Sequence, residues 1–197
     1  MALPILLDEN SEVLLLTCQT IKKDLDSSNQ FIVGCALIAI AEFCKPDMCR
    51  DMCSEVLKLM NDSNPFIKKR VALTLLKIAK VCPDLIDTFS GKLDTYFTEK
   101  NNGVLICGLE LIIFIFNAVP KIIKKYRKYL NNMFKFIKEL ISVSYYPEYE
   151  VNGIIDPFLQ AKIIEVFKLF GKDKNNACEE ISDVLANVIK NFIKLSF

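Results

Sequence analysis

Three prolines recur at a fixed interval along the chain. Pro46, Pro83 and Pro120 are 37 residues apart, and each opens an apolar stretch with helical spacing. Proline suits the first turn of a helix, where the N–H group that it lacks would be unpaired in any case. A period in the upper thirties is typical of stacked helical repeats. The spacing therefore predicts an all-α protein built from similar units.

A second marker, a small residue followed by leucine, recurs every 36 residues at Ala36-Leu37, Ala72-Leu73 and Gly108-Leu109. Two markers per period indicate two helices per unit, as in a HEAT or armadillo-like α solenoid. A fourth unit begins at Pro157, after a polar, tyrosine-rich insert from Val143 to Ile155. We expect one solenoid segment over residues 5–187 and an atypical tail at 188–197.

The pattern of apolar residues predicts the helix boundaries to within a few residues. The expected helices are 11–25, 29–44, 46–61, 65–82, 84–99, 102–118, 120–142 with a break near 129, 157–170 and 177–195. Phe31 to Phe43 is apolar around most of its circumference, whereas Asp47 to Met60 is amphipathic. This difference predicts that one helical layer is more enclosed than the other.

The composition excludes several classes of function. The chain has no histidine, so it cannot supply a Ser-His-Asp triad, a Cys-His dyad or a histidine-ligated metal site. Its 25 basic and 24 acidic residues argue against a dedicated nucleic-acid binder. The carboxylate pairs Glu148/Glu150 and Glu179/Glu180 stand in polar stretches, where nothing apolar would raise a pKa for acid catalysis. We therefore expect neither enzymatic activity nor a cofactor.

The cysteines fit a reduced interior better than a disulfide or metal framework. The chain has eight, and the tightest group is Cys44, Cys49 and Cys53, for which no fourth zinc ligand stands nearby. Free cysteines commonly pack as small apolar residues. Met1 to Leu7 has no secretory pattern, so we expect a cytosolic location. The apolar run from Gly103 to Val119 is short for a membrane span and contains Glu110, which favours a core helix.

One segment concentrates positive charge without any intervening acid. Its basic residues are Lys121, Lys124, Lys125, Arg127, Lys128, Lys135 and Lys138. Apolar residues occupy the opposite stripe, so the segment predicts a basic helix face. Three interpretations remain open: a merely solvated face, a surface for an acidic partner or an anionic membrane, and a weaker RNA-binding alternative in which Tyr126 and Tyr129 stack bases.

Several short motifs resemble the gamma-adaptin family, the gamma-type large subunits of heterotetrameric clathrin adaptors. The matching strings are Leu6-Leu7-Asp8-Glu9, residues 21–25, Met48-Cys49-Arg50-Asp51, residues 99–105, Tyr146-Pro147-Glu148 and residues 153–160. The last string resembles the gamma chains and differs from the alpha and beta large chains. The resemblance covers about residues 5–187 and implies the same solenoid trunk.

This resemblance implies a non-catalytic scaffold in vesicle-mediated transport between the trans-Golgi network and endosomes. The implied partners are the small sigma, beta large and medium mu subunits, with an Arf-type GTPase and sorting-signal cargo bound through the full complex. The implied location is cytoplasmic and peripheral, at Golgi and endosomal membranes and clathrin-coated vesicles. No ligand-binding residue can be carried over by motif.

An alternative is a free-standing armadillo or HEAT-type solenoid that binds protein cargo. Such a protein would be expected to carry asparagine and tryptophan ladders along a groove, and this chain has no tryptophan. The family's large chains begin before Leu6 and continue far beyond residue 187. We therefore expect this sequence to be an N-terminal trunk fragment of a longer chain.

Overall fold

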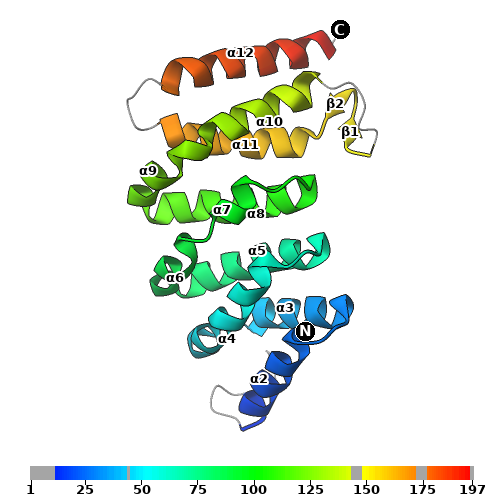
Figure 1. Cartoon of the computed structure of the whole chain (residues 1–197), viewed down its shortest axis with the longest axis vertical. Coiled ribbons are helices and arrows are strands. Elements are labelled where there is room, and N and C mark those ends of the chain that lie inside the picture. Colours follow the sequence, from blue (N-terminus) through cyan, green and yellow to red (C-terminus); the bar gives the residue numbers. More distant parts are fainter. Residues whose placement is uncertain (1–11, 44, 143–147, 172–176, 196–197) are drawn as a thin grey trace. The chain divides into compact units, whose positions relative to one another are not determined.

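The computed structural model describes residues 12–43, 45–142, 148–171 and 177–195 (Figure 1). Contacts within the chain divide it into two compact units, Met1–Thr95 and Tyr96–Phe197. Each unit consists mainly of helices, and the described residues contain a single two-stranded sheet. The predicted all-α solenoid class is confirmed.

The first unit is built around α3 and α5. Its helices are α2 (Glu12–Leu25), α3 (Gln30–Phe43), α4 (Pro46–Lys58), η1 (Leu59–Asn61), α5 (Pro65–Val81), η2 (Pro83–Leu85) and α6 (Ile86–Ser90). Helix α5 packs against both α3 and α4, and α2 packs against α3. A buried hydrogen bond joins the central pair, because the Thr74 hydroxyl donates to the carbonyl of Leu37 at 3.1 Å.

Helix α5 begins where the proline marker predicts. Pro65 occupies its first turn, and the side chain of Asn64 accepts a hydrogen bond from the backbone N–H of Phe66 at 2.9 Å. This cap satisfies one of the N–H groups that the first turn leaves unpaired. Asn64 also donates to the side chain of Gln30, at the start of α3. The two helix starts are thereby fixed to each other.

The second unit contains the longest apolar helix and a small hairpin. Helix α7 (Asp94–Phe97) leads into it, followed by α8 (Asn102–Ala118), η3 (Pro120–Ile122), α9 (Ile123–Tyr126), η4 (Arg127–Tyr129), α10 (Leu130–Ser142), β1 (Glu150–Val151), β2 (Ile154–Ile155), α11 (Pro157–Gly171) and α12 (Ala177–Leu195). Helix α11 packs against α8, α10 and α12. Most of α8 is buried, as expected of a core helix, and Glu110 pairs with Lys162 of α11 at 2.5 Å.

No single helix among the described residues is long and apolar enough to span a membrane; α8 passes that test only together with Pro120–Ile141, across a bend of 114°.

One predicted helix differs from the structure, and one predicted helix break is confirmed. The helix expected at 84–99 is wrong: the chain instead forms η2, α6 and α7, with a turn after Gly91. Phe89 before this turn and Leu93 within it are both fully buried. Their spacing of four residues also suits one face of a continuous helix, so the apolar pattern does not reveal the turn. The break expected near residue 129 is confirmed, because η4 separates α9 from α10.

The insert before the fourth unit contains the hairpin, which the helix assignment did not anticipate. Strands β1 and β2 are antiparallel, with Glu150 opposite Ile155 and Val151 opposite Ile154. The two residues between them, Asn152 and Gly153, have φ values of 52° and 79°. Asparagine followed by glycine suits such a turn, because both tolerate the left-handed region.

The second unit depends on a close approach between Tyr96 and α8. A Cβ atom on Gly108 would lie 2.5 Å from Cγ and Cδ1 of Tyr96 and 2.6 Å from its Cβ. The Tyr96 side chain is fully buried, and atoms so close to the backbone cannot move aside by a rotation at the end of the side chain. We predict that Gly108→Ala lowers the free energy of unfolding by about 1–3 kcal/mol, since overpacking outweighs the gain in helix propensity. Urea or thermal unfolding measures this change.

Gly171→Ala is the matched control, because a Cβ there would meet Ile181 at an ordinary 3.8 Å. That variant should be as stable as the parent or more stable. Equal effects of the two substitutions would contradict the packing argument.

Candidate functional site

The predicted basic face is divided into two groups by the break before α10. Lys121 lies on η3, Lys124 and Lys125 on α9, and Arg127 and Lys128 on η4. We call these five residues the turn group. Lys135 and Lys138 lie further along, on α10, and are exposed. The sequence pattern therefore identifies basic residues that the fold does not gather on one helix face.

The two tyrosines beside the turn group, Tyr126 and Tyr129, pack against core aromatic rings. Tyr126 is fully buried, and its ring lies 5.5 Å from that of Phe97. Tyr129 stacks on Phe97 with a centroid separation of 5.0 Å. The ammonium groups of Lys125 and Lys128 lie over the rings of Tyr126 and Tyr129, at 5.6 Å and 4.8 Å from the centroids. These rings are therefore engaged in packing rather than presented for base stacking.

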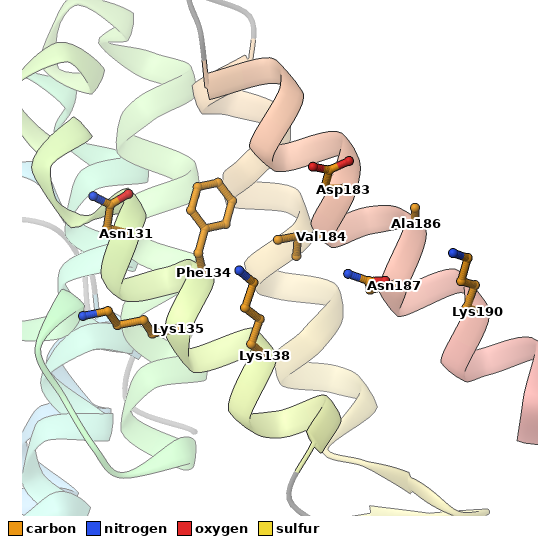
Figure 2. A pocket seen from close by; sticks show the side chains of 9 residues that line it. All are labelled: Asn131, Phe134, Lys135, Lys138, Asp183, Val184, Ala186, Asn187 and Lys190. Carbon is orange, nitrogen blue, oxygen red and sulfur yellow. The ribbon is translucent and has the colours of Figure 1, made fainter.

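The α10 lysines border an open groove of about 600 Å³ between α10 and α12 (Figure 2). Lys190 of α12 borders the same groove, together with Asn131, Asn187 and Asp183. Lys138 and Lys190 are 52 residues apart in the sequence, and only the packing of α10 against α12 places both on this groove. No pattern in the sequence pairs them.

An exposed apolar face in the first unit is a second candidate site. It comprises Phe31, Ile32 and Ile38 of α3 and Phe66 and Leu73 of α5, of which Phe31 is 64% exposed. The Phe31 ring meets that of Phe66 edge to face at 5.9 Å, so the two helices contribute to one surface. We call these five residues the α3–α5 face.

At α3 this exposure differs from the expectation that the layer containing Phe31 to Phe43 is more enclosed than the layer of amphipathic helices. The helix is apolar around its circumference, but its partners in the described residues cover only part of it. Phe31 and Ile38 are seven residues apart and so lie on one side of α3, but the sequence of a helix that is apolar all round does not show that this side lacks a neighbour.

In the described ranges, the cysteines and carboxylates singled out from the sequence do not form a metal site. Cys49 and Cys53 are buried, as expected, whereas Cys44 lies outside the described residues. No group of three histidine, cysteine, aspartate or glutamate side chains suited to a metal occurs in the described part of the chain. Glu148 and Glu150 are exposed, and the side chains of Glu179 and Glu180 lie outside the described part.

Comparison with known proteins yields one consistent family. The family model for the adaptin N-terminal region matches residues 1–194. The AP-1 complex subunit gamma-1 of Mycosarcoma maydis is 38% identical over 187 residues, which cover 95% of this chain and 21% of that protein. The AP-1 complex subunit gamma of Dictyostelium discoideum is 36% identical over 191 residues, covering 97% of this chain and 21% of that protein.

A plant relative gives the same result. The AP-1 complex subunit gamma-1 of Arabidopsis thaliana is 34% identical over 189 residues, covering 95% of this chain and 22% of that protein. The chain therefore spans about a fifth of the length of the curated relatives it matches.

The cysteine side chains differ sharply in solvent exposure, so they should differ in their rates of alkylation. Burial raises the pKa of the Cys53 thiol above its usual value, so less of the reactive thiolate is present at neutral pH. Cys35 is exposed on α3, contrary to the expectation that cysteines within apolar runs are buried. We predict that iodoacetamide at about pH 8 alkylates Cys35 at least about tenfold faster than Cys53. Peptide mass spectrometry over time measures both rates.

Raising the pH should increase the Cys53 rate, because a raised pKa moves thiolate formation to higher pH. Denatured protein is the control, and there both sites should react at similar rates. Equal rates in the folded protein would contradict the burial of Cys53.

Proposed function

The chain belongs to the adaptin N-terminal region family, and from this membership we propose that it acts as a non-catalytic scaffold subunit of an AP-1-type clathrin adaptor. The observation that carries the proposal is that at least 95% of this chain matches gamma subunits from a fungus, an amoeba and a plant. The process served is vesicle-mediated protein transport between the trans-Golgi network and endosomes. The alternative of a free-standing cargo-binding solenoid is disfavoured, because these relatives are named as subunits of a complex.

The α3–α5 face supports a role in assembly. Each large apolar side chain gains about 1.5–3 kcal/mol when it moves from water into a packed interface. Phe31, Ile38 and Leu73 are partly exposed on two helices that pack against each other, so one partner surface could cover them together. We propose that this face contacts the small sigma subunit.

The beta and mu subunits, an Arf-type GTPase and sorting-signal cargo are the further partners proposed for the whole complex.

The turn group supports a peripheral membrane association. Lys121, Lys124 and Lys125 are exposed on the short helices before α10. A basic residue near an anionic membrane surface contributes about 1 kcal/mol of attraction. We propose that the turn group lies near the anionic lipid surface of Golgi and endosomal membranes, with the complex itself residing in the cytoplasm.

Co-expression tests the proposed contact with the small subunit. The chain and a sigma-type adaptor subunit from the same organism should co-elute as a one-to-one complex in size-exclusion chromatography. Phe31→Asp with Ile38→Asp should weaken the complex more than about 100-fold, since two apolar contacts are lost and two carboxylates would be desolvated. Binding is quantified by isothermal titration calorimetry.

Ile189→Asp is the control, because Ile189 is also exposed but lies on α12 of the second unit. It should leave the affinity for sigma within about twofold. Failure of the unmodified chain to bind sigma, or equal loss in both variants, would contradict the assigned face.

Flotation with vesicles tests the membrane contact of the turn group. In the assembled adaptor complex, Lys121→Glu with Lys124→Glu should lower binding to phosphatidylserine-containing vesicles by about tenfold or more, because attraction is replaced by repulsion. Lys135→Glu with Lys138→Glu makes the same charge change on α10 and should have a smaller effect. A larger effect of the α10 pair would rule out the turn group as the main contact.

A further inference from the structure

The groove between α10 and α12 has charged rims above an apolar floor. Phe134 of α10 and Val184 of α12 are largely buried and form its floor. Figure 2 shows Lys138 rising from α10 and Lys190 from α12, with Asn187 between them. Two cations from different helices therefore face the same hollow.

The polar residues form a short ladder along each helix. On α10, Asn131 and Lys138 are seven residues apart, and on α12 the same spacing separates Asp183 from Lys190. Seven residues correspond to two helical turns, so members of each pair lie on one side of their helix. The charges are consequently sorted: Asp183 lies toward one end of the groove, and both lysines lie toward the other.

The lysines are not neutralised within the described structure. No described side chain forms a salt bridge with Lys138 or Lys190. Clefts with low-dielectric walls concentrate the potential of the charges that line them. The lysine end of the groove is therefore suited to an anionic group from another molecule.

Lys135 also borders the groove but takes a different direction. In Figure 2 its side chain extends toward the far side of α10, away from α12. There it lines a second hollow with Phe97 and Asn132. Lys135 thus has the charge of Lys138 without the same access to the groove, which makes it a useful control.

The dimensions fit a short stretch of extended peptide. Two helical turns span about 10 Å, equal to the length of about three residues in an extended chain. The amides of Asn131 and Asn187 can both donate to and accept from a peptide backbone, whose groups require such partners when they leave water. We propose that the groove binds an extended acidic segment of a partner protein, with its carboxylates at the Lys138 and Lys190 end.

The shape favours a peptide over a membrane. A bilayer presents a broad surface, which contacts exposed side chains such as those of Lys121 and Lys124 in the short helices before α10. Lys138 and Lys190 instead flank a hollow whose floor is Phe134 and Val184. A narrow chain can enter this hollow and place carboxylates between the two ammonium groups. The inference does not depend on which adaptor subunits the chain assembles with.

Fluorescence anisotropy with the 197-residue chain tests the proposal. The probe is a fluorescein-labelled, end-capped hexapeptide of aspartate and glutamate, and its neutral counterpart contains asparagine and glutamine. The acidic probe should bind and the neutral one should not. Lys138→Glu with Lys190→Glu should weaken binding by about tenfold or more, because both attractive charges become repulsive. Lys124→Glu with Lys135→Glu, which changes the net charge equally, should alter the affinity by less than about twofold.

Equal weakening by the two pairs would overturn the proposal, because binding would then follow net charge rather than the groove. Absence of binding to the unmodified chain would also overturn it. Lys138→Gln with Lys190→Gln provides a milder test should the charge reversal disturb folding, and circular dichroism checks the helix content of each variant. Vesicles containing phosphatidylserine form a separate arm. If the groove pair abolishes vesicle binding while the peptide fails to bind, the groove is a membrane contact and the peptide proposal is wrong.

Discussion

A helix with apolar residues on several sides is stable only when other helices bury each of those sides, and this requirement determines the packing within both units. Helix α5 is covered by α3 and α4, and α8 is covered in large part by α11. Where cover is complete, the side chains form a dense core, as at Phe116 and Phe170, whose rings meet edge to face at 5.6 Å. Where the described chain supplies less cover, on α3, large apolar side chains remain in water. The same constraint therefore accounts for stability and for the surface that we propose for assembly.

The sequence predicts the regular parts of the fold well because their signals are local. Pro65 and the Asn64 cap determine the start of α5 without reference to distant residues. The helix expected at 84–99 fails because Phe89 and Leu93 keep the spacing of one helix face although a turn at residues 91–93 interrupts the helix. The hairpin had a readable signal in Asn152-Gly153, but the flanking strands have only two residues each.

The candidate sites divide in the same way. Positive charge between Lys121 and Lys138 is visible in the sequence, yet its separation into a turn group and an α10 group requires the backbone break at η4. Lys190 could not be associated with Lys138 by spacing, because a hairpin and two helix starts intervene. Conversely, the sequence does not predict the α3–α5 face, because a helix that is apolar all round does not reveal which of its sides lacks a neighbour. Clusters of charged residues were therefore easier to predict from the sequence than exposed apolar surface.

The junction after the hairpin explains how a repeat can be interrupted and then resumed. Asp156 has a φ of 44°, a conformation that is uncommon outside glycine, and it is held there by bonds from three directions. Its carboxylate accepts hydrogen bonds from the Asn102 amide at 3.0 Å and from the N–H of Leu159 at 3.1 Å, and its own N–H donates to Tyr149. One residue therefore closes the hairpin, caps α11 and fastens that helix to the start of α8. Insertions of different length can therefore be accommodated before Asp156, since its hydrogen bonds, and not the length of the loop, fix where the next helix begins.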